Sequence, residues 1–424
     1  MTSVPPPDLY RWRADLLQFE HPEQCRILTD QVIEVDADGV IVSVRAYRPG
    51  EAVDHDHRGA LIAPGFIDAH VHFPQLDVIG SPAEGLLPWL EQHTFPAEAR
   101  FADAGHAREV ANAFIAELLR HGVTTASVYC TSHPQSVDAF MQASLELGLA
   151  MIAGKVLQDR HSPDSLRDDT EQSLLDTDAL IKRWHRRDRL RYAITPRFAP
   201  TSSERQLAGA AELARAHPDV LVQSHVAENR QEIDWVRSLF PGDRSYLSVY
   251  ERFGLLRPHS IWGHCIHLDA EDRAMLNANQ ALAAVCPTSN LFLGSGLFNF
   301  AAASHPWALA SDIGGGSSFS PFRSMMAAYE IARLQGHYLR PATLWWHCTA
   351  GAAQALGLGS RLGCVASGND ADFIVVDPAA KPLLARRWGQ AHTDEERLFS
   401  MIVLGDDRNI RQTVVRGRVV HDAR

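Results

Sequence analysis

A chain of 424 residues with a formal net charge of −11 is poorly suited to bind the phosphate backbone of a nucleic acid or an anionic membrane surface. Hydrophobic residues make up 46% and charged residues 21%, which is typical of a globular protein with a large core. No apolar run approaches the roughly 20 residues of a membrane helix, and the first residues lack the apolar core of a secretory signal. The six cysteines are scattered without a Cys-x-x-Cys pair, so we expect reduced thiols in a cytoplasmic protein.

Both ends of the chain carry strand patterns. Residues 8–62 are predicted as strands, and Asp36-Ala37-Asp38-Gly39 is a tight-turn signature between two of them. Near the other end, strands are predicted at 371–376, 412–415 and 418–420, the last two forming a hairpin around Arg416-Gly417. We therefore predict one small β-sandwich domain assembled from residues 1–62 and 366–424.

The middle of the chain alternates between apolar runs and amphipathic segments. Strand-like runs lie at 61–67, 123–129, 149–156, 191–197, 220–225, 260–264, 281–285 and 307–311. Helical spacing of apolar residues predicts helices at 105–121, 203–217 and 320–336. Eight strands alternating with helices predict a (β/α)8 TIM barrel over residues 63–365. A doubly wound sheet is the alternative, although no Gly-x-Gly-x-x-Gly turn follows a strand.

The first barrel strand leads into a pair of histidines within LIAPGFIDAHVHFPQ (61–75). In a strand, residues i and i+2 share a face, so His70 and His72 would aim two imidazoles at one point. This arrangement suits a metal ion with nitrogen ligands. The chain contains 21 histidines, so the spacing alone also fits a chance pair. The position at the end of an apolar strand favours the metal.

Other ionisable residues also stand at the ends of predicted barrel strands: Arg197, His225, His264 and Asp312. Any one of them alone is more often a hydrogen-bonded structural residue. Because active sites of such barrels lie at the carboxyl ends of the strands, we expect these side chains to share one site.

We predict a metal site whose ligands are His70, His72, His225 and Asp312. Three imidazoles and a carboxylate favour zinc, and iron(II) also suits these ligand types. Such an ion can acidify a bound water, and Asp312 can both bind the ion and take the water's proton.

Glu228 lies just past the strand that ends in His225, within reach of a substrate at the metal. A carboxylic acid there can relay a proton from water to a leaving group. The alternative is a charge that complements a helix N-terminus. His264 is either a fifth ligand or a hydrogen-bond donor to the hydroxide, and we favour the second role. The site is therefore predicted to be hydrolytic.

These residues lie in segments that resemble the amidohydrolase superfamily and, within its mononuclear nucleobase-deaminating branch, the guanine deaminase family. The resemblance extends over nearly the whole chain. The segments are PGFIDAHVHFPQ (64–75), LPWLEQHTFPAEARF (87–101), TPRF (195–198), SHVAEN (224–229), HC (264–265), CPTSNLFLGSG (286–296), SDIGGG (311–316) and LGDDRNI (404–410). The His-x-His pair is common to the superfamily. The TFPAE-R-F block, TPRF before SHVAEN, and LGDDRNI are much more specific.

The resemblance implies a zinc-carrying barrel, a β-sandwich from both termini, a homodimer, and a role in purine salvage or catabolism. It implies hydrolysis of guanine to xanthine and ammonia by a metal-bound hydroxide. By position, Gln75 and Arg197 match the family residues that grip the purine, with Phe198 nearby. An Arg fork can donate to purine O6 and N7, and an amide can donate and accept along the N2–N3 edge.

The family mechanism also implies roles for the acidic residues and the third strand-end histidine. Glu228 would move a proton to ring N3 and then to the departing ammonia. His264 and Asp312 would stabilise the hydroxide, and His225, Glu228 and Asp312 also border the substrate. Arg197 stands at the end of the fourth strand, where dinuclear relatives carry a bridging modified lysine. This difference argues for one metal ion per chain.

Two other functions remain open at the level of the sequence. One is a sibling hydrolase that acts on another aminated or chlorinated ring, such as a triazine or a modified purine. Gln75, Arg197 and the TFPAE block weigh against it. The other is a non-catalytic barrel that has lost its chemistry, although every candidate metal ligand is present.

Overall fold

The computed structural model describes residues 9–423, so residues 1–8 and 424 of the predicted β domain lie outside this range. Parallel strands in the middle of the chain form a barrel. They are β5 (Phe66–His72), β6 (Val123–Tyr129), β7 (Ile152–Gly154), β8 (Val156–Leu157), β9 (Arg191–Pro196), β10 (Leu221–Val226), β11 (Ile261–His264), β12 (Leu282–Val285) and β13 (Trp307–Leu309). Their order is β13-β12-β11-β10-β9-β7-β6-β5, with β8 paired to β9.

The barrel is closed between β5 and the segment that follows β13. The amide N–H of Asp312 donates to the His70 carbonyl at 3.0 Å, and that of His72 donates to the Ile313 carbonyl at 2.8 Å. These two bonds join the ends of the strand order, so the predicted (β/α)8 barrel is confirmed. These backbone bonds form the seam of the barrel, and they place three of the predicted metal ligands, His70, His72 and Asp312, next to one another.

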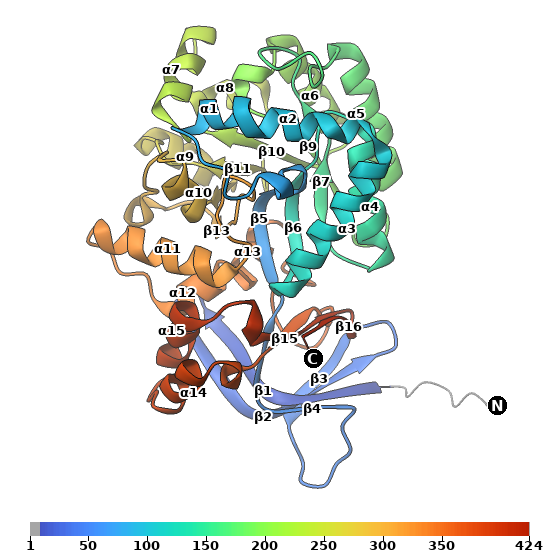
Figure 1. Cartoon of the computed structure of the whole chain (residues 1–424), viewed down its shortest axis with the longest axis vertical. Helices are drawn as coiled ribbons and strands as arrows, with labels where there is room; N and C mark the ends of the chain where they lie inside the picture. Colours follow the sequence, from blue (N-terminus) through green and yellow to red (C-terminus); the bar gives the residue numbers. More distant parts are fainter. Residues whose placement is uncertain (1–8, 424) are drawn as a thin grey trace, which may run out of the picture.

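Helices surround the barrel wall (Figure 1). The longer ones are α3 (Ala104–Arg120), α4 (Pro134–Glu146), α5 (Thr170–Trp184), α6 (Glu204–Ala216), α7 (Arg230–Leu239), α8 (Tyr246–Phe253), α9 (Ala270–Ala278) and α11 (Pro321–Leu334). The helices predicted at 105–121, 203–217 and 320–336 correspond to α3, α6 and α11. In α3, Val110, Phe114 and Leu118 recur at helical spacing and are buried, because that face packs against the core.

Short helices also lie in the segments that connect or follow the barrel strands. They are the 3-10 helix η1 (Phe73–Val78), α1 (Leu86–Trp89), the π-helical turn η2 (Leu90–Thr94), α2 (Phe95–Ala99), α10 (Pro287–Phe292), α12 (Pro341–Trp346) and α13 (Ala350–Ala355). Helices α1 and α2 with η2 form one continuous helical segment that crosses the barrel in Figure 1.

Strands from both ends of the chain form a second sheet of seven strands in the order β16-β15-β14-β4-β1-β2-β3. They are β1 (Leu9–His21), β2 (Gln24–Asp36), β3 (Ile41–Ala46), β4 (His55–Pro64), β14 (Phe373–Val376), β15 (Ile410–Val415) and β16 (Arg418–Asp422). Trp12, Ile33, Ile62 and Phe373 belong to one buried apolar core of this sheet. The prediction of a small β domain built from both termini, with both hairpins, is confirmed.

Two features of this region differ from the sequence-based prediction. The apolar run at 61–67 was predicted as the first barrel strand, but residues up to Pro64 belong to β4 of the terminal sheet, and the barrel strand begins at Phe66. The last five residues of β4 and all of β5 are buried, so one apolar run extends through two sheets. Between β14 and β15 the chain also forms two helices that were not predicted, α14 (Pro382–Gly389) and α15 (Asp394–Leu404).

Gly65 alone separates β4 from β5. A Cβ at this position would overlap the side chain of Thr124, with its Cγ2 atom only 2.6 Å away. The strand continues from the terminal sheet into the barrel, so the carboxyl end of β5 points away from that sheet (Figure 1). The predicted site therefore lies at the end of the molecule opposite the terminal sheet.

Candidate active site

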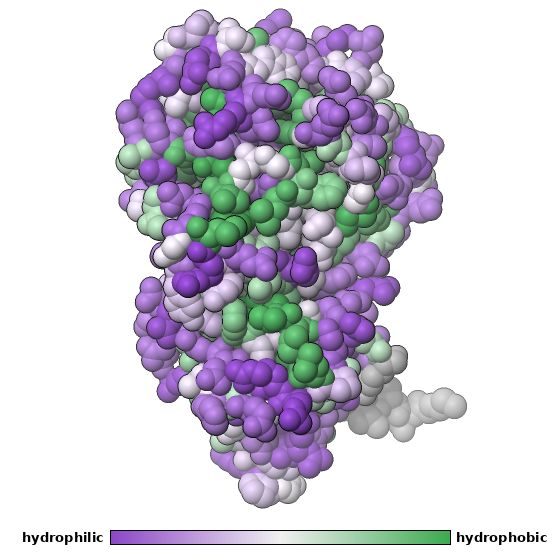
Figure 2. All heavy atoms as spheres, turned by 60° about the vertical axis from the view of Figure 1, so that its left-hand side comes forward, coloured by the Kyte–Doolittle hydropathy of each residue, from purple (hydrophilic) through white to green (hydrophobic). Residues whose placement is uncertain are grey.

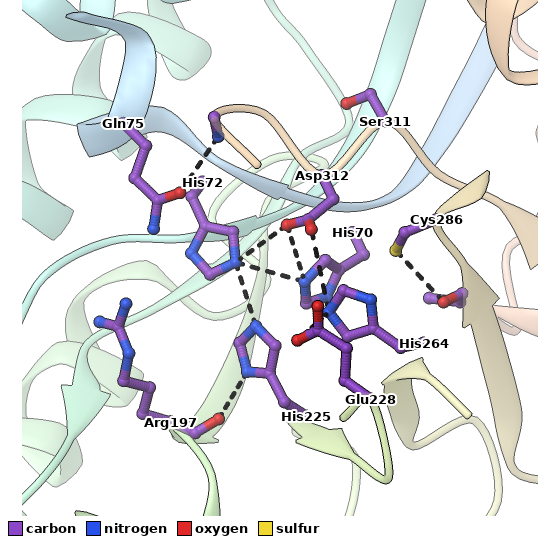
Figure 3. Close-up of polar contacts among 12 residues, drawn as sticks. His70, His72, Gln75, Arg197, His225, Glu228, His264, Cys286, Ser311 and Asp312 are labelled. Carbon is purple, nitrogen blue, oxygen red and sulfur yellow. Dashed lines mark hydrogen bonds and ion pairs between the residues drawn. The ribbon is translucent and has the colours of Figure 1, made fainter. Parts of the chain in front are cut away.

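Three histidines converge at the carboxyl ends of β5 and β10 (Figure 3). The Nε2 atom of His72 lies 3.2 Å from Nε2 of His70 and 3.2 Å from Nε2 of His225. In a tetrahedral site with ligands about 2.0–2.1 Å from the ion, two ligand atoms are roughly 3.3–3.4 Å apart. The observed separations fit a shared divalent ion.

Asp312 completes this cluster from the segment after β13. Its Oδ1 atom lies 3.4 Å from Nε2 of both His70 and His72. Burial disfavours the charged carboxylate, yet the adjacent imidazoles of His70 and His264 hold the pKa of Asp312 at about 2. Burial also lowers the pKa of His70, His72 and His225. Neutral imidazoles beside an ionised carboxylate are the donor set that zinc prefers.

The backbone holds one of these ligands in a defined orientation. Nδ1 of His225 lies 2.6 Å from the carbonyl oxygen of Arg197, so the ring donates its proton there and Nε2 keeps the lone pair that faces the cluster. The main-chain carbonyl of Arg197 thus orients one imidazole of the histidine cluster.

Left-handed backbone conformations bring several of the site residues into place. Ala227, His264 and Asp312 have φ values of +52°, +68° and +52°, which non-glycine residues rarely adopt. Asp68 supports the seam beneath the site, since its carboxylate accepts the backbone N–H groups of His70 at 3.2 Å and Ser311 at 3.0 Å. Burial raises the pKa of Asp68 to about 6.

Glu228 and His264 face each other beside the histidine cluster (Figure 3). The Oε2 atom of Glu228 lies 3.3 Å from Nε2 of His264, and its Oε1 atom accepts the hydroxyl proton of Ser295 at 2.7 Å. Burial raises the pKa of Glu228. A buried carboxyl group with a raised pKa is suited to both accept and donate a proton near neutral pH.

His264 is also oriented by its second ring nitrogen. Nδ1 donates to Oδ1 of Asn290 at 2.9 Å, while Nε2 lies 3.8 Å from Oδ2 of Asp312. Although burial opposes it, the charges of Glu228 and Asp312 raise the pKa of His264. The imidazole can therefore donate a hydrogen bond between the two carboxylates.

On the other side of the cluster, Arg197 and Gln75 are held by the carboxylate of Glu98. Arg197 donates through Nη1 to Oε2 at 2.6 Å and through Nη2 to Oε1 at 3.0 Å. Gln75 Nε2 donates to Oε1 at 3.0 Å. Gln75 Oε1 accepts the backbone N–H of Gly314 at 3.1 Å.

One pocket contains most of these groups together with an apolar wall. It is lined by His72, Gln75, Leu86, Trp89, Leu90, Arg197, Phe198, His225, Glu228, Glu232, His264, Leu293 and Asp312. Convergent polar groups beside apolar side chains are typical of a site for a small-molecule ligand. His70 lies behind this lining, within the histidine cluster.

The structure thus brings every predicted site residue into one neighbourhood. Sequence reasoning did not single out Glu98, Asn290, Ser295 or Glu232, whose carboxylate accepts the backbone N–H groups of Glu228 and Asn229 at 3.1 Å each. Glu98 and Ser295 lie within the quoted segments 87–101 and 286–296. Both segments contain several other polar residues, so polarity alone did not distinguish these two side chains.

A family model described as the amidohydrolase family matches residues 61–420. Guanine deaminase of Escherichia coli (strain K12) is 45% identical over 373 residues, which are 87% of this chain and 84% of that protein. A solved structure of E. coli guanine deaminase has a TM-score of 0.94 at 40% identity and covers 98% of this chain and 100% of that one. That of guanine deaminase from C. acetobutylicum, with bound guanine in its active site, has a TM-score of 0.90 at 29% identity, with coverages of 97% and 100%.

Proposed function

The chain belongs to the amidohydrolase family, and we propose that it hydrolyses guanine to xanthine and ammonia. One observation carries the proposal: a single pocket contains a metal-ligand cluster, a buried general acid and an Arg–Gln pair suited to a purine edge. The guanine deaminases described above support the same substrate.

One zinc ion per chain is the proposed cofactor, held by His70, His72, His225 and Asp312, and iron(II) also suits this donor set. The separations among the ligand atoms support one shared ion. When bound, a divalent ion here supplies a Lewis acid that lowers the pKa of water toward about 7.

The chain's own groups handle the protons of the reaction. Oxygen from water replaces the amino group at C2, so one proton must reach ring N3 and another must leave with ammonia. Glu228 transfers both, since its carboxyl group is buried and its pKa is raised. His264 and Asp312 hold the attacking water and stabilise the tetrahedral centre by hydrogen bonds.

The residues that recognise the ring lie across the pocket from Glu228 and His264. Arg197 donates to purine O6 and N7, and Gln75 pairs with the N2–N3 edge, with Phe198 beside them. Buried polar groups arranged for these atoms reject a ring that lacks them by orders of magnitude, because they would be left unpaired.

The deciding experiment is ammonia release from purified protein of known metal content. Guanine, adenine, cytosine and a triazine are assayed in parallel. We expect release from guanine only, with about one metal ion per chain. Release from another ring instead would contradict the assignment of Arg197 and Gln75 as guanine readers.

The proposed assembly is a homodimer in the cytoplasm. All six cysteines are free thiols, which supports a reducing compartment. Within residues 9–423, no helix is both long and apolar enough to cross a bilayer. Analytical ultracentrifugation of the purified protein tests the dimer directly.

A further inference from the structure

Glu98 is a fully buried carboxylate that does not belong to the metal cluster. It lies in α2, within the helical segment that crosses the barrel, and its exposed fraction is 0%. A charged carboxylate in such a position is unfavourable unless it is paired and hydrogen-bonded. The groups that pair with Glu98 therefore indicate the role of this buried carboxylate.

Those partners are the two residues proposed to read the purine. The paired N–H groups of Arg197 bind both oxygens of Glu98, an interaction that fixes the plane of the guanidinium as well as its position. The ring of Phe95, also in α2, lies 5.3 Å from Cζ of Arg197. The pair of hydrogen bonds to Glu98 uses two of the five N–H donors of the Arg197 side chain and leaves three for a ligand.

The same carboxylate determines which way the Gln75 amide faces. Nε2 must point at Glu98 because a carboxylate only accepts hydrogen bonds, and Oε1 must then face the backbone N–H of Gly314. A flipped amide would place oxygen against the carboxylate and nitrogen against a donor. Glu98 thus orients two side chains that come from η1 and from the end of β9.

We propose that Glu98 is a positioning residue for guanine selectivity: it holds Arg197 and Gln75 in the orientation in which they recognise the purine. This inference rests on the proposed function. Pre-organised donors lose little conformational entropy on binding, so the benefit goes to a ring that pairs with all of them. A ring without O6 forms fewer hydrogen bonds with the ordered guanidinium, so its binding improves less.

A purely structural ion pair would behave differently. Loss of such a pair would lower stability and reduce the activity on every ring by the same factor. A positioning role changes the ratio between rings. The test is therefore the ratio of kcat/KM for guanine to kcat/KM for 2-aminopurine, which keeps N7 and the 2-amino group and lacks O6.

The primary variant is Glu98→Gln, which keeps the size of the side chain and removes one acceptor. We expect the guanine/2-aminopurine ratio to fall at least tenfold, mainly through a higher KM for guanine, with metal content unchanged. Glu98→Asp keeps the charge with a shorter reach and should give an intermediate ratio. It also provides the test if Glu98→Gln does not fold.

The matched control is Glu91→Gln, an exposed glutamate in the preceding turn η2, for which we expect the wild-type ratio. An unchanged ratio in both Glu98→Gln and Glu98→Asp would overturn the role of Glu98 alone, whether the activity on guanine stays at the wild-type level or falls by the same factor as that on 2-aminopurine. Wild-type protein that releases no ammonia from guanine would instead overturn the proposed function, and the selectivity role with it.

Discussion

Arg197 contributes to the site through two separate groups. Its carbonyl oxygen accepts the Nδ1 proton of His225, and its guanidinium pairs with Glu98. A side-chain substitution leaves the carbonyl in place. A substitution of the Arg197 side chain should therefore perturb recognition of the ring and leave the orientation of His225 in the proposed metal site unchanged.

The clearest change at the scale of one residue is Glu228→Gln. An amide cannot transfer the two protons, so we expect kcat to fall by about 10²–10⁴-fold. Metal content and guanine binding should persist, since Glu228 is not among the proposed ligands. Steady-state kinetics, metal analysis and calorimetric titration with guanine measure these quantities. Loss of the metal would make Glu228 a structural residue.

Ser295→Ala should change the pH dependence. The hydroxyl of Ser295 donates to Glu228 and lowers the pKa of that carboxyl group, while burial raises it. Without the hydroxyl the pKa of Glu228 rises further, so the carboxylate form is lost at a higher pH. The acidic limb of the kcat/KM profile should therefore move to higher pH.

The matched control for this shift is Ser238→Ala. Ser238 is exposed on α7, and within the described residues its hydroxyl hydrogen-bonds only to the carbonyl of Trp235. We expect its pH profile to match the wild type. A shift toward lower pH in Ser295→Ala would contradict the assigned hydrogen bond.

The site residues differ in how far local sequence could identify them. His70, His225 and His264 each end an apolar run, and strand ends converge in a barrel, so their association followed from pattern and fold class. Glu98 lies inside a helix and contacts Arg197 across 99 positions of sequence. Ser295 lies in a loop, 67 positions from Glu228. No local periodicity encodes such contacts, because they depend on how separate elements pack.

At the scale of the element, the junction between β4 and β5 is the most constrained connection. The boundary at Gly65 could not be predicted, since the end of β4 and the start of β5 are both buried and their apolar residues form one run. The close approach of Thr124 explains why a side chain is excluded there.

Gly65→Ala should therefore be destabilising, by about 1–3 kcal/mol, because the added methyl group forces β5 away from β6. Chemical denaturation measures the loss. Adding Thr124→Ala removes the two overlapping atoms and should restore part of the stability. Gly242→Ala is the control, because a Cβ there meets nothing within 4 Å. Equal loss in the single and the double variant would contradict the steric explanation.

At the scale of the whole molecule, a buried ion pair joins the barrel to the terminal sheet. Arg189, just before β9, donates to Asp370 at 3.1 Å and to Asp372 at 2.9 Å, and the three side chains are at most 8% exposed. The expected two-part architecture followed from strand patterns at both ends, whereas this contact spans more than 180 positions and has no local signal.

Arg189→Ala should lower the free energy of unfolding by about 3–5 kcal/mol, since it leaves the buried carboxylate of Asp372 without its ion-pair partner and leaves Asp370 with Arg361 alone. Denaturant unfolding gives the value, and the guanine kinetics of the folded fraction should stay close to wild type because Arg189 lies at the opposite end of β9 from Arg197. Arg237→Ala removes an ion pair whose two side chains are each 73% exposed and should change stability by less than about 1 kcal/mol. Similar losses of stability in both variants would contradict the role of Arg189 in joining the barrel to the terminal sheet.

The order of strands in the terminal sheet also has a consequence for biosynthesis. Strand β4 pairs with β1 on one edge and with β14 on the other, and β14 begins only at Phe373. At about 5–20 residues per second, a ribosome needs roughly 15–60 s to travel from β4 to β14. All proposed metal ligands have been synthesised by then, yet one edge of β4 is still unpaired and open to other chains. The nascent protein can assemble its metal cluster during translation, but its terminal sheet closes only when the last strands emerge.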